Sequence, residues 1–295
     1  MADGASSPAL TIKSLSARGV VVPMRRPLVT GGGSVTQAPL VLIDLQTTEG
    51  PLGHAYAFTY TPLALAGTVS LINEIGTALA GHSAMPFARS QKLTGMVKLL
   101  GHEGLVGVAL AGIDTAAWDA FAKSKDMPLY QTLGTDHTAL PLYNSCGLGL
   151  IGPNKVGDEA KALLEGGFTA VKLRLGYPTL AEDLAVVDAV RNAVPPEIHV
   201  MTDYNQSLTI AEAKIRVQAM ADRDLTWIEE PTRYTDYDGH AEISAVSTIP
   251  IQLGENCWGP HDFARAIDAG SGDYLMPDLI KIGGVTGWMK ASALA

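Results

Sequence analysis

Apolar and polar positions change rhythm in the second half of the chain, where short strand-like runs alternate with segments of helical period. Six apolar runs predict strands, and a segment that predicts a helix follows each of them. The predicted strands cover 140–145, 170–175, 198–203, 226–229, 250–255 and 274–278. The predicted helices cover 154–166, 180–194, 209–223, 238–246 and 260–269, and a sixth begins near Val285. Such alternation is typical of a parallel sheet covered by helices.

Four of these strands end in an acid at regular intervals. Glu229 lies 26 residues after Asp203, Glu255 lies 26 residues after Glu229, and Asp278 lies 23 residues after Glu255. One strand, one helix and their turns take roughly 25–30 residues, so each acid falls at the same point of a repeated unit. The carboxyl ends of strands in a parallel barrel meet at one mouth, where the chemistry of such enzymes lies. Three carboxylates there would repel one another unless a cation lay between them, which predicts a metal site.

The predicted ligands Asp203, Glu229 and Glu255 offer oxygen and neither sulfur nor imidazole. This set suits Mg²⁺, which takes few carboxylates and leaves positions for substrate oxygens, whereas Ca²⁺ needs more ligands. The alternative is that each acid caps the helix that follows it. The near-equal spacing of the three acids favours the metal site.

Two basic residues lie on the strand before the Asp203 strand. Lys172 and Arg174 are two positions apart, so both side chains point to the same face. Beside a metal and an anionic substrate, they would neutralise charge or move a proton. The alternative is a solvated pair at a strand edge.

Three more residues near the predicted mouth have candidate roles. Asp278 is placed to orient a histidine, with a helix cap or a pair with Lys281 as the alternative. Asn205 follows Asp203 by two positions and is placed to reach a substrate hydroxyl. Glu230 is expected to face away from the metal, because neighbours on a strand alternate.

The first third of the chain predicts an α+β layout. Strand-like runs fill 8–60 and helical periodicity fills 62–124, which places one domain at 1–135 and the barrel domain at 136–295. Three successive glycines in Pro27–Ser34 predict a mobile loop. No Gly-Lys-Ser/Thr follows, so a flexible lid is favoured over a phosphate cradle, with a plain surface loop as the alternative.

Composition narrows the class of protein. The 295 residues carry a net charge of −9 with scattered acids, which does not indicate a nucleic-acid surface. Cys146 and Cys257 lie far apart and are expected to be reduced thiols. The N-terminus shows no signal peptide, and no uninterrupted apolar run approaches the ~20 residues that span a bilayer. We therefore expect a cytoplasmic protein that binds neither membrane nor nucleic acid.

Several motifs resemble those of the enolase superfamily, and more closely its mandelate racemase subgroup. They are Val171-Lys172-Leu173-Arg174, Asp203-Tyr204-Asn205-Gln206, Trp227-Ile228-Glu229-Glu230-Pro231, Gly254-Glu255-Asn256, and Pro277-Asp278 with Lys281-Ile282-Gly283-Gly284. The resemblance extends from the N-terminal strands to the last residue. It implies an α/β fold in which an α+β capping domain covers a modified (β/α) TIM-like barrel, with Mg²⁺ at the three acids. We also expect a homo-oligomer that binds a small-molecule carboxylate.

The resemblance also implies roles for individual residues. Lys172 would lie near the substrate carboxylate, Asn205 would contact the substrate, and Asp278 would be the partner of a catalytic histidine. Tyr60 and the Val29–Val35 loop would line the pocket from the capping domain, and Ser145 would lie near the substrate hydroxyl. The expected histidine falls beyond Ala295, so two further barrel units are expected to be missing from this sequence.

Arg174 departs from the family pattern, which has a second lysine there as a base. The pKa of an arginine side chain lies so far above 7 that roughly one in 10⁷ is neutral at pH 7, at a cost of about 9 kcal/mol. Three interpretations therefore stay open. The first is a Mg²⁺-dependent 2-hydroxy-acid racemase that removes the α-proton through an ene-diolate, chemistry that the superfamily is known for. The second, favoured by Arg174, is an acid-sugar dehydratase, and the third is a non-catalytic homologue.

Overall fold

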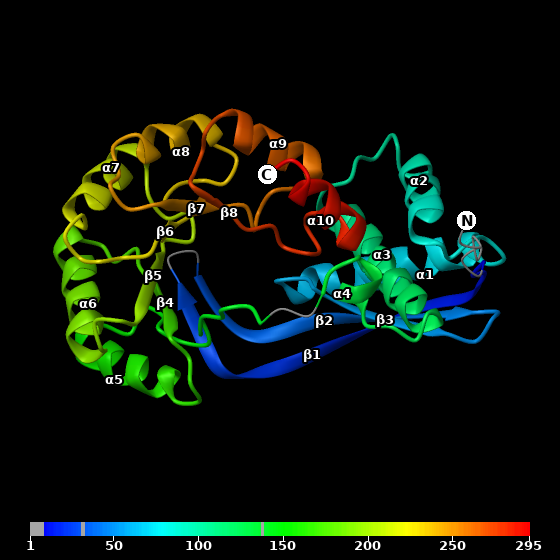
Figure 1. Cartoon of the computed structure of the whole chain (residues 1–295), viewed down its shortest axis with the longest axis horizontal. Coiled ribbons are helices and arrows are strands. Elements are labelled where there is room, and N and C mark those ends of the chain that lie inside the picture. The colour runs from blue at the N-terminus through cyan, green and yellow to red at the C-terminus, as the bar shows by residue number, and fades with distance from the viewer. Residues whose placement is uncertain (1–8, 31–32, 137–138) are drawn as a thin grey trace.

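The computed structural model describes residues 9–30, 33–136 and 139–295. An antiparallel sheet with its helices forms one side of the molecule, and a parallel sheet inside an arc of helices forms the other (Figure 1). This arrangement confirms the predicted α/β barrel-like fold with an α+β capping domain. The predicted division at residues 135 and 136 stays a prediction.

The capping domain is built on a three-stranded sheet of order β1-β2-β3. Its strands are β1 (Ile12–Thr30), β2 (Gly33–Thr47) and β3 (Leu52–Phe58). Its helices are α1 (Pro62–Leu79), α2 (Pro86–Met96), α3 (Gly104–Ser124) and α4 (Leu129–Thr132). Alternate residues of β2, such as Val41 and Ile43, share one core with α3. The packing is close, since a Cβ on Gly53 would lie 1.9 Å from the Ala116 carbonyl oxygen.

The parallel sheet has strand order β4-β5-β6-β7-β8, the order of the strands in the chain. Its strands are β4 (Ala170–Arg174), β5 (His199–Asp203), β6 (Ile228–Glu229), β7 (Ile251–Leu253) and β8 (Tyr274–Leu275). Its helices are α5 (Pro153–Leu164), α6 (Leu180–Ala193), α7 (Ile210–Ala219), α8 (Tyr237–Ser244), α9 (Gly259–Asp268) and α10 (Gly284–Ser292). Two helices begin at capping boxes, Thr179 with Glu182 and Thr209 with Glu212.

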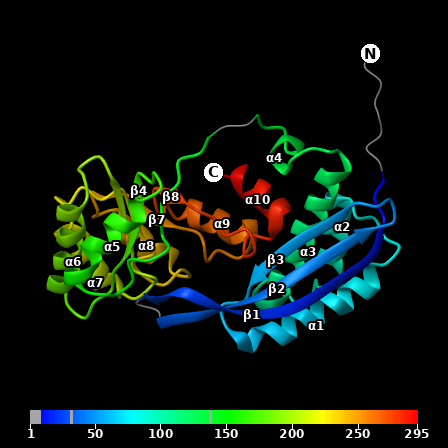
Figure 2. The same ribbon diagram turned by 90° about the horizontal axis from the view of Figure 1, so that it is seen from below.

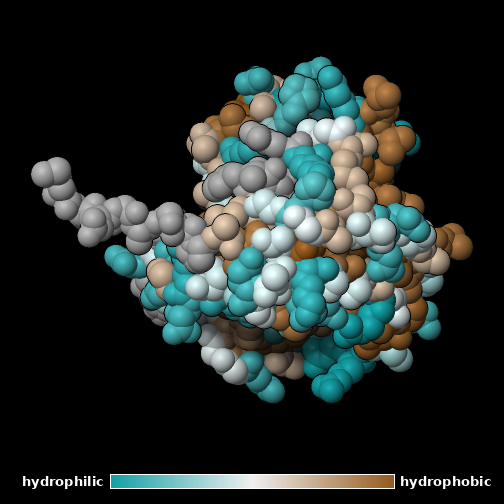
Figure 3. Space-filling view, turned by 90° about the vertical axis from the view of Figure 1, so that its right-hand side faces the viewer, coloured by the Kyte–Doolittle hydropathy of each residue, from teal (hydrophilic) through white to brown (hydrophobic). Residues whose placement is uncertain are grey.

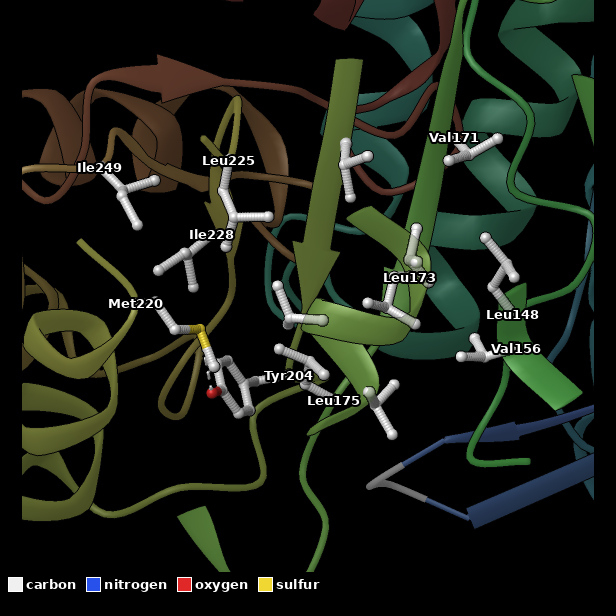
Figure 4. Close-up of a cluster of buried hydrophobic side chains, with 14 of the residues drawn as sticks. Leu148, Val156, Val171, Leu173, Leu175, Tyr204, Met220, Leu225, Ile228 and Ile249 are labelled. Carbon is white, nitrogen blue, oxygen red and sulfur yellow. Dashed lines mark hydrogen bonds between the residues drawn. The ribbon is translucent and has the colours of Figure 1, made fainter. Parts of the chain in front are cut away.

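One face of the parallel sheet packs against the helices. Val171, Leu173, Val200 and Ile228 are fully buried in this cluster with apolar residues of α5, α6 and α7 (Figure 4). Because neighbours on a strand alternate, the intervening polar residues of β4 and β5 point to the opposite face. The alternation along these strands thus places apolar side chains in an outer layer against the helices and charged side chains in an inner layer.

The segment 140–145 is not a strand, so this prediction was wrong. Its pairing reduces to a single parallel bridge between Asn144 and Val171. Asn144 donates its N–H to the Ala170 carbonyl at 2.9 Å and accepts from the Lys172 N–H at 3.1 Å. Pro141 lacks an N–H, which limits the ladder before that point.

The predicted loop at Pro27–Ser34 is instead the end of a long hairpin. Val29 pairs with Ser34 and Thr30 pairs with Gly33, while Gly31 and Gly32 lie outside the described residues. The hairpin crosses from the capping sheet to the barrel (Figure 1). There the Leu150 N–H donates to the Val29 carbonyl at 3.0 Å. The described end of the hairpin therefore docks on the barrel through Val29.

A second contact between the domains joins α3 to α10, which lie side by side in two views (Figures 1 and 2). Both carboxylate oxygens of buried Asp114 accept from Thr286, one from its N–H at 2.9 Å and one from its hydroxyl at 2.7 Å. The indole N–H of Trp118 donates to the same hydroxyl at 2.9 Å. These buried hydrogen bonds fix the capping domain against the barrel.

Among the described helices, α1 and α3 are long and apolar enough to cross a bilayer by length and composition alone. Buried residues make up 72% of the α3 window and 28% of the α1 window. Core helices of soluble proteins pass the same test, so length and composition alone do not indicate that α1 or α3 spans a membrane. On the face at the end of the capping domain, hydrophilic residues are mixed with residues of intermediate hydropathy, and hydrophobic ones gather along an edge (Figure 3).

Candidate active site

Acids gather at the carboxyl ends of the parallel strands, as the spacing predicts. Asp203 is the last residue of β5 and pairs in register with Glu229, the last residue of β6. Both are buried, with 1% and 0% of their surface exposed. Glu255 follows β7 by two residues and is half-buried. The predicted mouth is therefore real, and two of its acids lie on adjacent strands.

The ammonium of Lys172 lies between these two acids. Its Nζ is 2.7 Å from Oε1 of Glu229 and 3.2 Å from Oδ2 of Asp203. Arg174, on the same face of β4, places Nε at 3.6 Å from the same Asp203 oxygen. Both basic side chains are buried. The structure thus excludes the alternative that they form a solvated pair.

Crowding of acids shifts the protonation equilibria of the mouth. Burial first, then the charge of Asp203, raises the pKa of Glu229 to about 7. Burial and Glu255 raise the pKa of Glu230 to about 8, and burial and Asp203 raise that of Glu255. Burial lowers the pKa of Lys172, but Asp203 and Glu229 more than offset it and raise that pKa above its ordinary value. The mouth therefore carries more negative charge than Lys172 balances.

The side chains at the mouth determine whether a metal ion suits this site. Within the described residues, no three His, Cys, Asp or Glu side chains are gathered as a ready metal site. Asp203 and Glu255 nevertheless act on the charge of Glu229, and the ammonium of Lys172 lies between two of the three acids. Three carboxylates at one mouth, two of which (Glu229 and Glu255) have raised pKa values, are hard oxygen donors short of positive charge, which fits Mg²⁺. The predicted ligand set stays a prediction.

Unpaired polar atoms mark where a ligand would complete the site. Among the described contacts, Nε of Arg174, Oδ1 of Asn205 and both amide atoms of Gln252 are buried without a hydrogen-bond partner. Asn205 donates its N–H to Asp203 Oδ1 at 2.8 Å and its amide to Oδ2 at 3.1 Å. Its backbone φ is +45°, an uncommon left-handed conformation. Asn205 is thus held beside Asp203 with its Oδ1 unpaired among the described contacts.

The three other predicted residues lie around this mouth. Asp278 accepts the N–H groups of Ile280 and Lys281, each at 2.9 Å, so it caps the turn after β8. Tyr60 lies in the link from β3 to α1, and desolvation followed by the charges of Asp278, Glu255 and Glu230 raises its pKa. Ser145 is half-buried in the segment that runs beside the end of β4. Their functional roles stay predictions.

Glu230 does not face away from the mouth, so this prediction was wrong. β6 ends at Glu229, and Glu230 adopts a left-handed φ of +37° that breaks the alternation of the strand. The side chain turns back and accepts from the Asn256 amide nitrogen, which lies 2.8 Å from each carboxylate oxygen. Sequence reasoning also missed the role of Asn256, although both residues fall within the motifs that it singled out.

Aromatic side chains adjoin the acids and were not predicted. Tyr143 meets Trp227 edge to face at 5.6 Å between ring centroids, and Trp227 lies 5.9 Å from Tyr274. The indole N–H of Trp227 donates to Glu229 Oε2 at 3.3 Å. The Lys172 ammonium lies 5.7 Å from the Tyr143 ring centroid. These rings give the charged cluster an apolar wall.

Acids at the carboxyl ends of a parallel sheet, beside an antiparallel capping sheet, define an enzyme-like α/β barrel site. A model of the mandelate racemase / muconate lactonizing enzyme N-terminal domain matches residues 14–134. A model described as enolase C-terminal domain-like matches residues 155–295. The chain belongs to the enolase superfamily, in the mandelate racemase and muconate lactonizing enzyme family.

Known relatives catalyse different reactions. A 3,6-anhydro-alpha-L-galactonate cycloisomerase of Streptomyces coelicolor is 31% identical over 267 residues, which cover 89% of this chain and 73% of that protein. An L-talarate/galactarate dehydratase of Salmonella typhimurium is 30% identical over 265 residues, which cover 88% of this chain and 66% of that protein. More distant relatives include racemases and epimerases.

Solved structures share the fold. A Bradyrhizobium enolase complexed with magnesium and mandelic acid is 41% identical, with a TM-score of 0.92. The match covers 97% of this chain and 79% of that chain. The mandelic acid and magnesium are features of that complex.

Proposed function

We propose that this chain removes the α-proton of a small carboxylate substrate with the help of Mg²⁺, as a 2-hydroxy-acid racemase of the mandelate type. The observation that carries the proposal is the buried Lys172 ammonium, held between Asp203 and Glu229 beside unpaired polar atoms. The related Bradyrhizobium structure with magnesium and mandelic acid supports both the metal and the substrate class.

Asp203, Glu229 and Glu255 are the residues that would hold the metal. When bound, Mg²⁺ draws charge from the substrate carboxylate and makes the α-proton more acidic. Lys172 keeps its proton in this charged setting, so it orients and neutralises a substrate carboxylate. Asn205 offers Oδ1 to a substrate hydroxyl. The apolar wall of Tyr143 and Trp227 excludes water, which strengthens these electrostatic contacts.

Arg174 supports an acid-sugar dehydratase as the second candidate. A racemase needs a base on each face of the α-carbon, and arginine rarely gives up its proton. A dehydratase needs one base, and a permanent cation beside Asp203 stabilises an anionic intermediate without acting as a base. The cycloisomerase and dehydratase relatives act on acid sugars, which supports this substrate class.

Two assays separate the candidates. With Mg²⁺ and mandelate in D₂O, NMR should detect deuterium at the α-carbon if the racemase proposal is right. A screen of aldonic and aldaric acids for 2-keto products should be positive for the dehydratase. Silence in both, with Mg²⁺ still bound, identifies a non-catalytic homologue.

Arg174→Lys tests the basicity argument directly. The substitution should increase racemisation if the lack of a second base limits the rate. An unchanged rate contradicts this account of Arg174. The predicted homo-oligomer and cytoplasmic location belong to the same proposal, and light scattering of the purified protein tests the oligomeric state.

A further inference from the structure

A chain of polar contacts crosses the mouth from one barrel loop to the next. Lys281, after β8, donates to the Asn256 amide oxygen, and the Asn256 amide nitrogen lies 2.8 Å from both Glu230 oxygens. Gln206 donates to Glu230 Oε2 at 3.1 Å and accepts the Tyr234 N–H at 3.1 Å. The contacts join the loops that follow β5, β6, β7 and β8. They leave the Lys281 ammonium at one end of the chain.

Tyr60 of the capping domain completes this chain. The Lys281 Nζ lies 4.4 Å from the centroid of the Tyr60 ring, and Lys281 is only 8% exposed. A buried ammonium against an aromatic face gives a stronger cation–π contact than an exposed one. Tyr60 itself stays 53% exposed, so the contact with Lys281 leaves about half of the residue's surface open to solvent. Phe58 adds support, with ring centroids 4.6 Å apart.

Backbone strain is concentrated in the same residues. Tyr60, Gln206 and Glu230 have φ angles of +59°, +65° and +37°. Left-handed backbone in residues other than glycine persists where surrounding contacts enforce it. Three members of one contact chain, from both domains, therefore hold conformations that their neighbours must maintain.

We propose that Lys281 is a positioning residue that fastens Tyr60 of the capping domain to the loops of the barrel mouth. The contact keeps the cap closed while the chain through Asn256 and Glu230 is intact. Removing the ammonium frees the Tyr60 segment and loosens the cap at the mouth. The effect on substrate rests on the proposed function, whereas the contact itself does not.

Hydrogen exchange of the full chain without ligand tests the contact. Lys281→Met should increase amide exchange in residues 58–61 by about 5–30-fold, the range from a partly exposed to a desolvated cation–π contact. Lys281→Arg keeps a cation and should stay within about twofold of the parent protein. Lys125→Met is the matched control, because Lys125 lies 5.0 Å from the Phe121 ring centroid, both on the α3 side of the capping domain.

The outcomes are distinct. A rise in residues 58–61 with Lys281→Met, and none with Lys125→Met, supports the proposal. No rise with Lys281→Met, or an equal rise with both, overturns it. If Lys281→Met does not fold, Tyr60→Leu and Tyr60→Phe are compared by the amide exchange of residues 279–283. Only Tyr60→Leu should increase this exchange, because Tyr60→Phe keeps an aromatic ring. Equal exchange in the two variants overturns the proposal.

Kinetics with mandelate and Mg²⁺ give the functional readout. Lys281→Met should raise KM about fivefold with kcat within about twofold, because the contact positions Tyr60 and does not act on the proton. Lys281→Arg should restore KM. If the parent protein shows no α-exchange with mandelate, the proposed function fails for that substrate. The exchange experiment still decides whether Lys281 fastens the cap.

Discussion

Lys172 supplies the positive charge closest to the paired acids at the mouth. Its ammonium contacts Glu229 at 2.7 Å and Asp203 at 3.2 Å, two of the three acids that would hold the metal. Lysine and metal would therefore compete for the same carboxylates. This competition separates the effect of Lys172 on metal binding from its effect on the reaction.

Lys172→Met should lower the α-proton exchange of a carboxylate substrate by about 10²–10³-fold, the range for the loss of one group that stabilises charge in the transition state. The Mg²⁺ affinity, measured by calorimetry, should stay equal or increase, because a competing cation is removed. Lys161→Met is the control, since Lys161 is exposed and lies 3.9 Å from Asp158. Weaker Mg²⁺ binding by Lys172→Met would contradict this account.

Sequence spacing was enough to predict that Asp203 and Glu229 end two strands of the parallel sheet, because the repeat length fixes where a strand ends. It was not enough for Glu230, since the left-handed turn after β6 reverses the direction that strand alternation predicts. The contact of Lys281 with Tyr60 joins positions more than two hundred residues apart, which no local pattern encodes.

At the scale of elements, a buried ion pair joins α6 to α7. Asp183 is fully buried and binds Arg216 and the Tyr204 hydroxyl, the latter at 3.1 Å. It also accepts two backbone N–H groups of the loop after β4. Since Tyr204 follows Asp203 directly, this pair supports the end of β5 from the helical side.

Asp183→Asn should lower the free energy of unfolding by about 3–5 kcal/mol, because it leaves the Arg216 charge buried without a counterion. Asp188→Asn is the matched control from the same helix. Asp188 pairs with Arg223 at 2.8 Å but is 49% exposed, so its loss should cost less than about 1 kcal/mol. Urea denaturation measures both, and equal effects would show that burial does not set the difference.

The hairpin of β1 and β2 depends on the absence of a side chain at Gly149. A Cβ there would lie 2.7 Å from the Val29 carbonyl oxygen, which also accepts the Leu150 N–H. Gly149→Ala should therefore displace the hairpin tip and raise exchange of the Leu150 amide roughly three- to tenfold, the value of one hydrogen bond. Gly95→Ala is the control in α2, where a Cβ meets nothing within 4 Å. Unchanged Leu150 protection in Gly149→Ala would contradict the docking.

The alternation of strands and helices was predictable because each element carries its own apolar period and its own cap, as at Thr179 and Thr209. The hairpin was not, since three glycines read locally as a loop. Its strands are stabilised by pairing along β2 and by the barrel surface at Val29, and neither contact leaves a periodic signal nearby.

At the scale of the whole molecule, the raised pKa values make folding depend on pH. Glu229 and Glu230 have pKa values of about 7 and about 8, against an ordinary value of 4.5. The folded state therefore binds more protons than the unfolded state across this range, so stability should fall as pH rises through it. His240 has a lowered pKa and acts in the opposite direction below 6.5, its ordinary value. Between about pH 6.5 and 8, the change of stability with pH therefore reports on Glu229 and Glu230 rather than on His240.

Mg²⁺ should reverse this dependence, because it binds the deprotonated carboxylates and adds stability as they lose their protons. Without metal, Tm should decrease from pH 6.5 to 8, and saturating Mg²⁺ should raise Tm more at pH 8 than at pH 6.5. Differential scanning calorimetry measures both series. Glu229→Gln should flatten the metal-free slope and weaken the Mg²⁺ response, since it removes one acid of the crowded set. A metal-free Tm that stays level or increases over this range would show that the acids of the mouth do not oppose folding, and the case for a cation among them would lose its electrostatic basis.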